Sequence, residues 1–183
     1  GQDAPPSSAA DDWPAVDLIA ENFSTKGRAL GKLELKASAE GRNWKLERLR
    51  LANPDGTLEA SGKWSISGRQ QRTEAELKLD VREAGPYLAR FGMPDAVKAA
   101  PTKLAGTLAW AGPPNDLAYA SLAGKLKLEV GKGQFTKIEP GIGKLLGVLS
   151  LQALPRRLTL DFGDIFSSGF AFDALSGEIS IEN

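Results

Sequence analysis

The chain of 183 residues contains neither cysteine nor histidine, and its 23 basic residues are balanced by 23 acidic ones. Without cysteine there is no disulfide, no thiolate nucleophile and no cysteine-ligated zinc or iron–sulfur site. Without histidine there is no Ser-His-Asp triad and no imidazole for metal binding or proton transfer. The zero net charge argues against a nucleic-acid partner, because nucleic-acid binding needs a basic surface that displaces counterions. We expect no catalytic residues, cofactor or metal site, although chemistry on carboxylates, lysine, tyrosine or serine is disfavoured rather than excluded.

A long hydrophobic run is also missing. The longest apolar-rich stretch, residues 142–154, is interrupted by glycine, lysine, serine and glutamine, and it is shorter than the ~20 apolar residues of a membrane span. The chain begins at Gly1 without a visible signal peptide, so we interpret it as part of a longer protein. Residues 1–12 are rich in Pro, Ser, Ala and Asp, which predicts a disordered linker or an expression remnant. Residues 13–183 are expected to form a single β-rich domain.

Short segments of alternating apolar and polar residues make up most of the chain after residue 13. This period of two is typical of β-strands with one buried face. In one such segment Leu33 and Leu35 lie on one face, and Lys32 and Glu34 lie on the other. The predicted strands cover residues 30–39, 57–66, 73–81, 104–110, 122–130, 158–162, 169–172 and 177–181.

The alternation changes phase between Trp44 and Leu51. A slip of one residue turns every later side chain to the other face, so we predict a β-bulge near Glu47 or Arg48. Residues 53–56 (Asn-Pro-Asp-Gly) predict a tight turn in which Pro presets φ and Gly accepts a positive φ. Because such connections are too short for helical crossovers, we expect an antiparallel meander.

Two segments have helical patterns. In residues 82–91, Pro86 lies near the first turn and Gly92 follows the last residue. Residues 142–154 place leucines on one face and end at Pro155. The predicted fold is therefore mainly β: a curved antiparallel sheet, shaped as a trough or groove, with one or two short helices.

No motif gives strong support to a chemical site. Residues 141–147 have the spacing G-x-G-x-x-x-G, which is one residue longer than a dinucleotide-binding fingerprint and lacks its βαβ context. Asp161 and Asp164 could act as a carboxylate pair, but a turn after a strand explains both. The four tryptophans each lie in or beside a strand pattern; core packing is the default interpretation and lining a ligand is the alternative. They are Trp13, Trp44, Trp64 and Trp110.

The apolar face of the predicted sheet must be covered by something. In one interpretation the two short helices cover it and the core is closed. In the other, the sheet curls into a trough whose apolar interior holds acyl chains, since large exposed apolar surfaces mark binding sites. The residues alone leave both interpretations open.

The last third of the chain contains several distinctive short motifs. They are GQF (133–135), PGIG (140–143), PRRL (155–158) and GFAFD (169–173), with a leucine-rich segment at 145–151. With these motifs, residues 131–183 closely resemble the C-terminal AsmA-like region of the YhdP proteins of Gram-negative bacteria. Upstream, the segments WPAVDL (13–18), GKW (62–64) and LAW (108–110) fit the same order of landmarks. The resemblance thus extends over residues 13–183.

This resemblance implies a location and a function. AsmA-like proteins, which are distantly related to TamB, are long β-rich bridges anchored in the inner membrane by an N-terminal helix. They cross the periplasm and carry phospholipid toward the outer membrane along a hydrophobic groove. The implied role is a periplasmic segment of a cell-envelope protein whose anchor is absent from this chain. The implied partners are phospholipid acyl chains, the remainder of the parent protein and, through its anchor, the inner membrane.

We predict that the apolar sheet face binds acyl chains during phospholipid transport between the inner and outer membranes, without catalysis. The groove residues inferred from the alternation are Leu33, Leu35, Leu58, Leu77, Leu79, Leu104, Leu108, Leu126, Leu128, Leu158, Leu160, Phe170 and Phe172. The alternative is a non-catalytic structural or interaction domain that supports outer-membrane integrity without binding lipid itself, its edge strands pairing with neighbouring segments. A carboxylate-based enzyme is a third alternative, for which the sequence offers no convincing pair of acidic residues.

Overall fold

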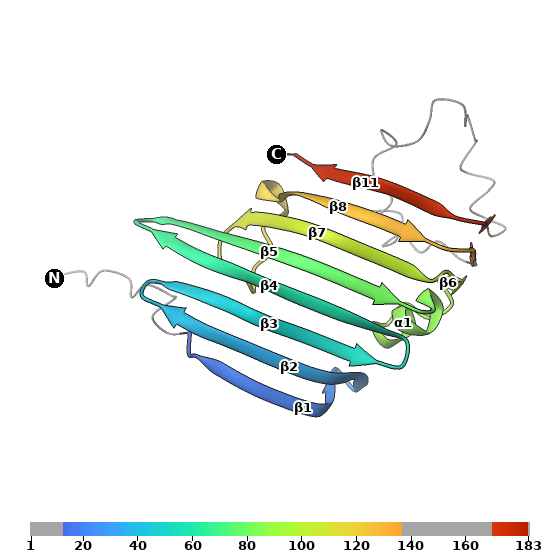
Figure 1. Cartoon of the computed structure of the whole chain (residues 1–183), viewed down its shortest axis with the longest axis horizontal. Helices are drawn as coiled ribbons and strands as arrows, with labels where there is room; N and C mark the ends of the chain where they lie inside the picture. Colours follow the sequence, from blue (N-terminus) through green and yellow to red (C-terminus); the bar gives the residue numbers. More distant parts are fainter. Residues whose placement is uncertain (1–12, 137–169, 183) are drawn as a thin grey trace.

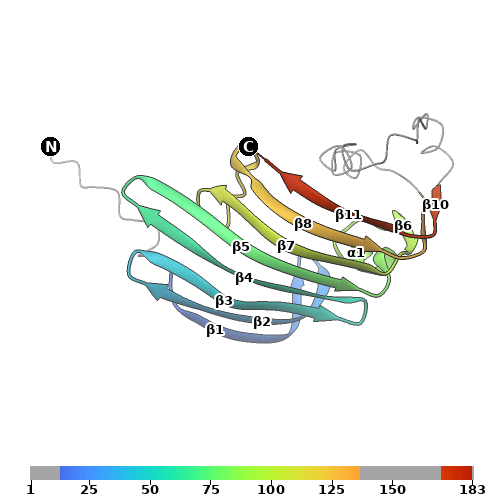
Figure 2. The same ribbon diagram turned by 45° about the horizontal axis from the view of Figure 1, so that its top comes forward.

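A single open β-sheet dominates the computed structural model, which describes residues 13–136 and 170–182. Eight strands lie in the order β1-β2-β3-β4-β5-β7-β8-β11, and every neighbouring pair is antiparallel (Figure 1). The sheet is curved, and its two edge strands, β1 and β11, lie far apart (Figure 2). The prediction of a mainly β, curved antiparallel sheet is confirmed. The strands are β1 (Val16–Thr25), β2 (Arg28–Glu40), β3 (Asn43–Asn53), β4 (Gly56–Ser67), β5 (Gln70–Val81), β7 (Thr102–Ala111), β8 (Ala123–Val130) and β11 (Leu175–Ile181).

The two faces of this sheet have opposite chemistry because apolar and charged residues alternate along the strands. On the polar face, Glu34 lies between two arginines, with its Oε2 3.2 Å from Arg50 Nη1 and 3.8 Å from Arg48 Nη2. Arg50 also pairs with Glu59 on the next strand, at 3.7 Å. These pairs are half-exposed, so each contributes at most about 1 kcal/mol to stability. Because these paired side chains carry opposite charges and stay in contact with water, the polar face is solvated and nearly neutral.

The predicted β-bulge lies in β3, and the structure confirms its position. The pairing with β2 passes from Lys36 opposite Arg48 to Ala37 opposite Leu46, so Glu47 has no partner in this register. The pairing with β4 shifts at the same place. The extra residue returns the later leucines of β3 to the face that Trp44 and Leu46 already occupy.

The predicted tight turn connects β3 to β4. The Asn53 Oδ1 atom accepts hydrogen bonds from the backbone N–H groups of Asp55, at 3.0 Å, and Gly56, at 3.1 Å. The expected positive φ at Gly56 is wrong, because Gly56 is not among the residues with positive φ. Glycine is favoured there for space: a Cβ atom would lie 2.8 Å from Asp80 O and 3.0 Å from the Tyr87 ring.

The helix predicted for residues 82–91 is observed as α1 (Ala84–Arg90). A short 3₁₀ helix, η1 (Tyr119–Ser121), lies in the connection between β7 and β8. The predicted linker 1–12, helix 142–154 and strand 158–162 lie outside the described residues. So do the glycine-rich segment 141–147 and the Asp161–Asp164 pair.

A second, small sheet was not predicted, although its strand β10 confirms the strand expected at residues 169–172. The sheet has the order β10-β9-β6 and consists of β6 (Val97–Ala99), β9 (Gly133–Phe135) and β10 (Phe170–Phe172). With three residues each, β6 and β9 are too short to display a period of two, so alternation did not identify them or the pairing of the three strands. This sheet and α1 lie at the same end of the large sheet, where β5 and β8 end (Figure 1).

Glycines allow two central strands to approach closely. Gly106 in β7 and Gly124 in β8 have φ values of +154° and +159°. A Cβ atom added to Gly106 would overlap the carbonyl oxygen of Lys125, and one added to Gly124 would overlap that of Thr107. Glycine at such positions permits the bend of a strongly curved sheet.

We predict that Gly106→Ala lowers the free energy of unfolding by about 2 kcal/mol, because β7 and β8 must separate to admit the methyl group. Gly177→Ala is the matched control, since a Cβ atom there meets nothing within 4 Å; its effect should stay below about 0.5 kcal/mol. Urea denaturation followed by circular dichroism measures both. Equal destabilisation by the two variants would contradict the close-approach explanation.

Candidate functional site

Three cross-strand rows of mainly apolar residues run across the large sheet on one face, perpendicular to the strands. They follow from the pairing register, because residues directly opposite each other on neighbouring strands point to the same side. We call these rows together the apolar strip. They are Ala20–Leu33–Leu51–Leu58–Leu79–Leu104–Leu128–Gly177, Leu18–Leu35–Leu49–Ala60–Leu77–Gly106–Leu126–Ile179 and Val16–Ala37–Leu46–Gly62–Ala75–Leu108–Gly124–Ile181.

Most leucines of the apolar strip are only half-buried, and those of β4, β5, β7 and β8 all are. Leu51 is buried, and among the described residues most of the other buried hydrophobic residues form two separate clusters. One contains Trp44 and Trp64, and the other contains Val97 and Phe172. The middle of the apolar face therefore keeps contact with solvent, while the two ends of the strands are packed.

Tryptophans form the border of the apolar strip at one end of the strands. Trp44 and Trp64 lie directly opposite each other on β3 and β4. Trp13, which precedes β1, packs edge-on against both, with ring centroids 5.0 Å from Trp44 and 5.2 Å from Trp64. Thr73 pairs with both Trp64 and Trp110, which extends the same row to β7.

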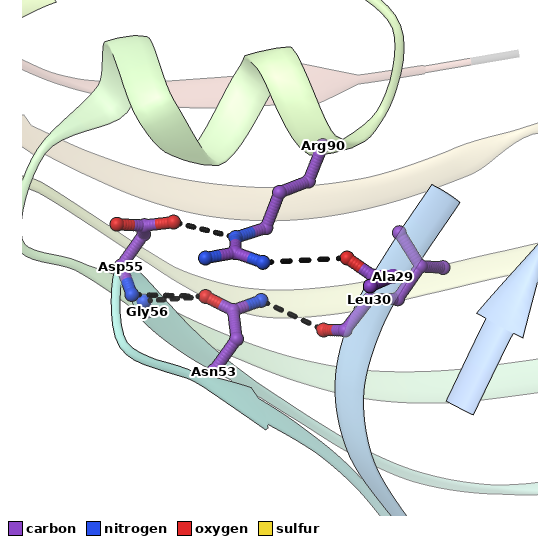
Figure 3. Close-up of polar contacts among 6 residues, drawn as sticks. All are labelled: Ala29, Leu30, Asn53, Asp55, Gly56 and Arg90. Carbon is purple, nitrogen blue, oxygen red and sulfur yellow. Dashed lines mark hydrogen bonds and ion pairs between the residues drawn. The ribbon is translucent and has the colours of Figure 1, made fainter. Parts of the chain in front are cut away.

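Helix α1 forms the border at the opposite end, and an ion pair holds its last residue. Arg90 Nε lies 2.5 Å from the Asp55 Oδ2 atom in the β3–β4 turn, and Arg90 Nη1 donates to Ala29 O at 3.3 Å (Figure 3). In the same network Asn53 Nδ2 donates to Leu30 O at 2.9 Å. The turn that joins β3 to β4 thus fixes β2 and α1 together.

A pocket of about 300 Å³ lies at the tryptophan border of the apolar strip. Its lining combines aromatic residues with the leucines of the neighbouring rows. We call it the tryptophan pocket; its lining includes Trp13, Trp44, Trp64, Trp110, Leu35, Leu46, Leu49 and Pro114.

A larger hollow of about 830 Å³ lies on the other, polar face of the sheet. Charged side chains line it, among them Glu40, Lys45, Lys63 and Glu74. Transfer of hydrocarbon to such a surface would leave these charges poorly solvated. The larger volume therefore does not make it the better site for an apolar ligand.

The structure places most of the predicted groove residues in the apolar strip. Leu33, Leu35, Leu58, Leu77, Leu79, Leu104, Leu108, Leu126 and Leu128 all belong to its rows. Leu158 and Leu160 lie outside the described residues. Phe170 and Phe172 belong to β10 of the small sheet. The Phe172 side chain is buried with Ala96 and Val97 and packs against Phe135, apart from the rows.

Three residues of β3 complete the rows and were not among the predicted groove residues. Leu49 lies between Leu35 and Ala60, Leu51 lies between Leu33 and Leu58, and Leu46 belongs to the third row. The phase change at the bulge was the signal that could have identified them. Because the bulge adds one residue, the apolar side chains before it and after it in β3 point to the same face.

Among the described ionisable groups, the Tyr87 hydroxyl has an environment that changes its pKa. Burial raises the pKa of the Tyr87 hydroxyl above its ordinary value, so this group stays neutral at physiological pH. Within residues 13–136 and 170–182, acidic side chains form no cluster of three or more that could hold a metal ion. The helices in the same part of the chain lack the length and hydropathy needed to cross a membrane.

Comparison with known proteins identifies the family. The family profile described as "YhdP protein" matches residues 1–183. The chain belongs to the YhdP family. A curated relative from Escherichia coli (strain K12), the "Intermembrane phospholipid transporter YhdP", is 27% identical over 164 residues. The resemblance noted in the sequence is thereby confirmed.

This YhdP-family chain corresponds to only a small part of its relative. The aligned region covers 89% of the chain and 13% of the E. coli protein. No solved structure matches the chain.

We predict that Asp55→Ala weakens the attachment of α1 in this YhdP-family chain. Loss of the half-buried ion pair with Arg90 should cost about 1–2 kcal/mol locally, which corresponds to about tenfold faster amide hydrogen exchange in α1. Hydrogen exchange with mass spectrometry measures the rate. Asp80→Ala, on the exposed polar face, is the control and should leave α1 unchanged; unchanged exchange in Asp55→Ala would mean that Tyr87 packing alone holds the helix.

Proposed function

We propose that the apolar strip binds the acyl chains of phospholipid, and that this segment serves a longer protein that moves phospholipid between the inner and outer membranes. The observation that supports this most strongly is the strip itself. Its rows cross all eight strands, with leucines on seven of them and isoleucines on β11, and most of these leucines are half-buried. The printed name of the E. coli relative, an intermembrane phospholipid transporter, supports the same ligand class.

The dimensions of the apolar strip suit hydrocarbon chains. Neighbouring strands lie about 4.8 Å apart, so rows that cross eight strands extend about 34 Å. The hydrocarbon core of a bilayer is about 30 Å thick for two leaflets, so one acyl chain spans about 15 Å. A lipid can therefore occupy several positions along the strip.

The chemistry of the strip favours binding without strong selectivity. Burial of apolar surface contributes about 25 cal/mol per Å² and has no preferred direction. The rows offer mainly aliphatic side chains, so an acyl chain loses little when it shifts from one leucine to the next. Movement along the strip then requires no catalytic group, and we propose no enzymatic activity.

The proposed cellular setting rests on the printed name of the relative, which describes transport between membranes. The chain spans 13% of the E. coli protein, so we propose the remainder of the parent as the partner at the sheet edges, with the inner membrane reached through the parent protein. An open sheet edge offers unpaired backbone groups to another strand. We place this segment in the periplasm, where a bridge between the two membranes must lie.

A structural or interaction role is the second candidate, and the edge strand β1 favours it. Leu18 is 45% exposed and Ile19 is 60% exposed, although they point to opposite faces. Exposed apolar residues on both faces of an edge strand are typical of a strand that a neighbour covers. A structural or interaction role would require no apolar ligand, whereas the lipid-binding role does.

Leu126→Glu tests the proposed function. The substitution places a charge in the middle row of the strip, on β8, and should strongly lower phospholipid binding by removing the positions that cross β8, because a carboxylate beside hydrocarbon loses its hydration. Thr107→Glu is the matched control: it adds the same charge on the exposed polar face of the adjacent strand and should bind as the unchanged chain does. Binding is measured with a fluorescent phospholipid and by mass spectrometry of lipid that co-purifies with the protein.

Each outcome separates the two candidates. Loss of lipid in Leu126→Glu alone supports binding on the strip. Absence of lipid from the unchanged chain by both methods would favour the structural role. Equal binding by both glutamate variants would show that lipid, if bound, lies elsewhere.

A further inference from the structure

The indole N–H groups of the tryptophan pocket differ in whether they have a hydrogen-bond acceptor. Trp44 Nε1 donates to Pro14 O at 3.1 Å, and Trp110 Nε1 donates to Pro113 O at 3.0 Å. Trp64 is fully buried, at 0% exposure, and no acceptor for its Nε1 atom lies among residues 13–136 and 170–182. Among the described residues, Trp64 Nε1 is the one buried side-chain nitrogen or oxygen atom without a hydrogen-bond partner.

An unpartnered donor at this buried position destabilises the folded protein. A buried N–H without an acceptor costs about 1–3 kcal/mol, and native proteins keep few such groups. Phenylalanine, although smaller, would keep an aromatic ring in this space without an unpartnered donor. The indole N–H of Trp64 therefore lowers the stability of the free protein. A ligand that supplies the acceptor would remove this cost in the bound state.

The tryptophan pocket adjoins the region proposed for acyl chains. Leu35 and Leu49 belong both to the middle row of the apolar strip and to the lining of the pocket. Trp13 packs edge-on against Trp64 and is itself only half-buried. Because Trp13 precedes β1, its ring can shift without breaking the pairing of the sheet.

The kind of acceptor follows from the surroundings. Aromatic and aliphatic residues make up most of the pocket lining, and its polar members include Ser61, Thr73, Glu74 and Asn115. Glu74 would repel a phosphate, which would also lose its hydration without a cation to compensate. Lys63, the cation among the lining residues, already lies 3.9 Å from Glu40. A neutral carbonyl oxygen is the acceptor that such a site tolerates, and tryptophan is typical of boundaries between hydrocarbon and polar groups.

On the basis of the proposed function, we propose that the tryptophan pocket binds the ester-linked glycerol region of a phospholipid, with Trp64 Nε1–H donating to an ester carbonyl. The acyl chains then extend over the leucines of the strip, and the charged headgroup remains in solvent. Trp13 moves aside on binding and exposes the indole N–H of Trp64. The pocket thus gives the lipid a preferred position on a strip that otherwise has none.

The test compares two phospholipids with identical headgroups and chain lengths, one ester-linked and one ether-linked. The ether lipid lacks the carbonyl oxygens but is otherwise similar. The unchanged chain should bind the ester lipid about fivefold more tightly, the ratio expected for one net hydrogen bond. Trp64→Phe should bind both lipids equally, at the affinity of the ether lipid. Tyr119→Phe is the control and should keep the ester preference, since it removes a hydroxyl donor from a side chain that is 79% exposed and lies outside the pocket lining.

The outcomes distinguish this inference from the proposed function. Tight but equal binding of both lipids by the unchanged chain overturns the role of Trp64 and leaves acyl binding on the strip intact. Binding of neither lipid overturns both. The ratio measured on the unchanged chain decides the question even if Trp64→Phe folds poorly, which circular dichroism would reveal. Loss of the ester preference in Tyr119→Phe as well would also count against a specific role for Trp64.

Discussion

The cross-strand register is the constraint on which the rest of this structure depends. Because the side-chain period of a strand is two, a slip by one residue at any pair would move the leucines of one strand to the charged face. The register instead places leucines of seven strands and the isoleucines of β11 on one face. Even the bulge in β3 serves this alignment, since the extra residue at Glu47 brings Leu46 and Leu49 to the same side. One apolar face and one charged face follow from it.

What covers the apolar face decides whether it is a core or a surface. The described helix α1 has 7 residues and is too short to cover eight strands, so it packs at one end, where Arg90 and Asp55 fix it. The tryptophans pack at the other end. Burial is therefore concentrated at the two borders, and the leucines between them stay partly exposed. A surface of this kind stabilises a protein less than a closed core does, and it is available to hydrocarbon.

A binding surface made of aliphatic side chains needs none of the residues that the chain lacks. Neither a thiol, an imidazole nor a net charge contributes to the burial of hydrocarbon. Charges that do occur are paired across the polar face, as with Glu34 and Arg50. The buried N–H of Trp64 has no partner among the described residues, unlike these paired charges. For that reason we propose that it makes a specific contact rather than contributing only to packing.

The sequence determined the large strands other than β1 (Val16–Thr25), the bulge, the β3–β4 turn and helix α1, because each depends on local alternation, on turn residues or on a short helical pattern. It also placed the leucines of β2, β4, β5, β7 and β8 on one face. Only the tertiary structure aligned these faces into rows, formed the small sheet from strands of three residues and separated Phe172 from the leucines. It also gathered Trp13, Trp44, Trp64 and Trp110 around one pocket. The physical reason is that pairing between strands and the contacts at strand ends join residues far apart in the chain, and alternation within one strand carries no information about its neighbours.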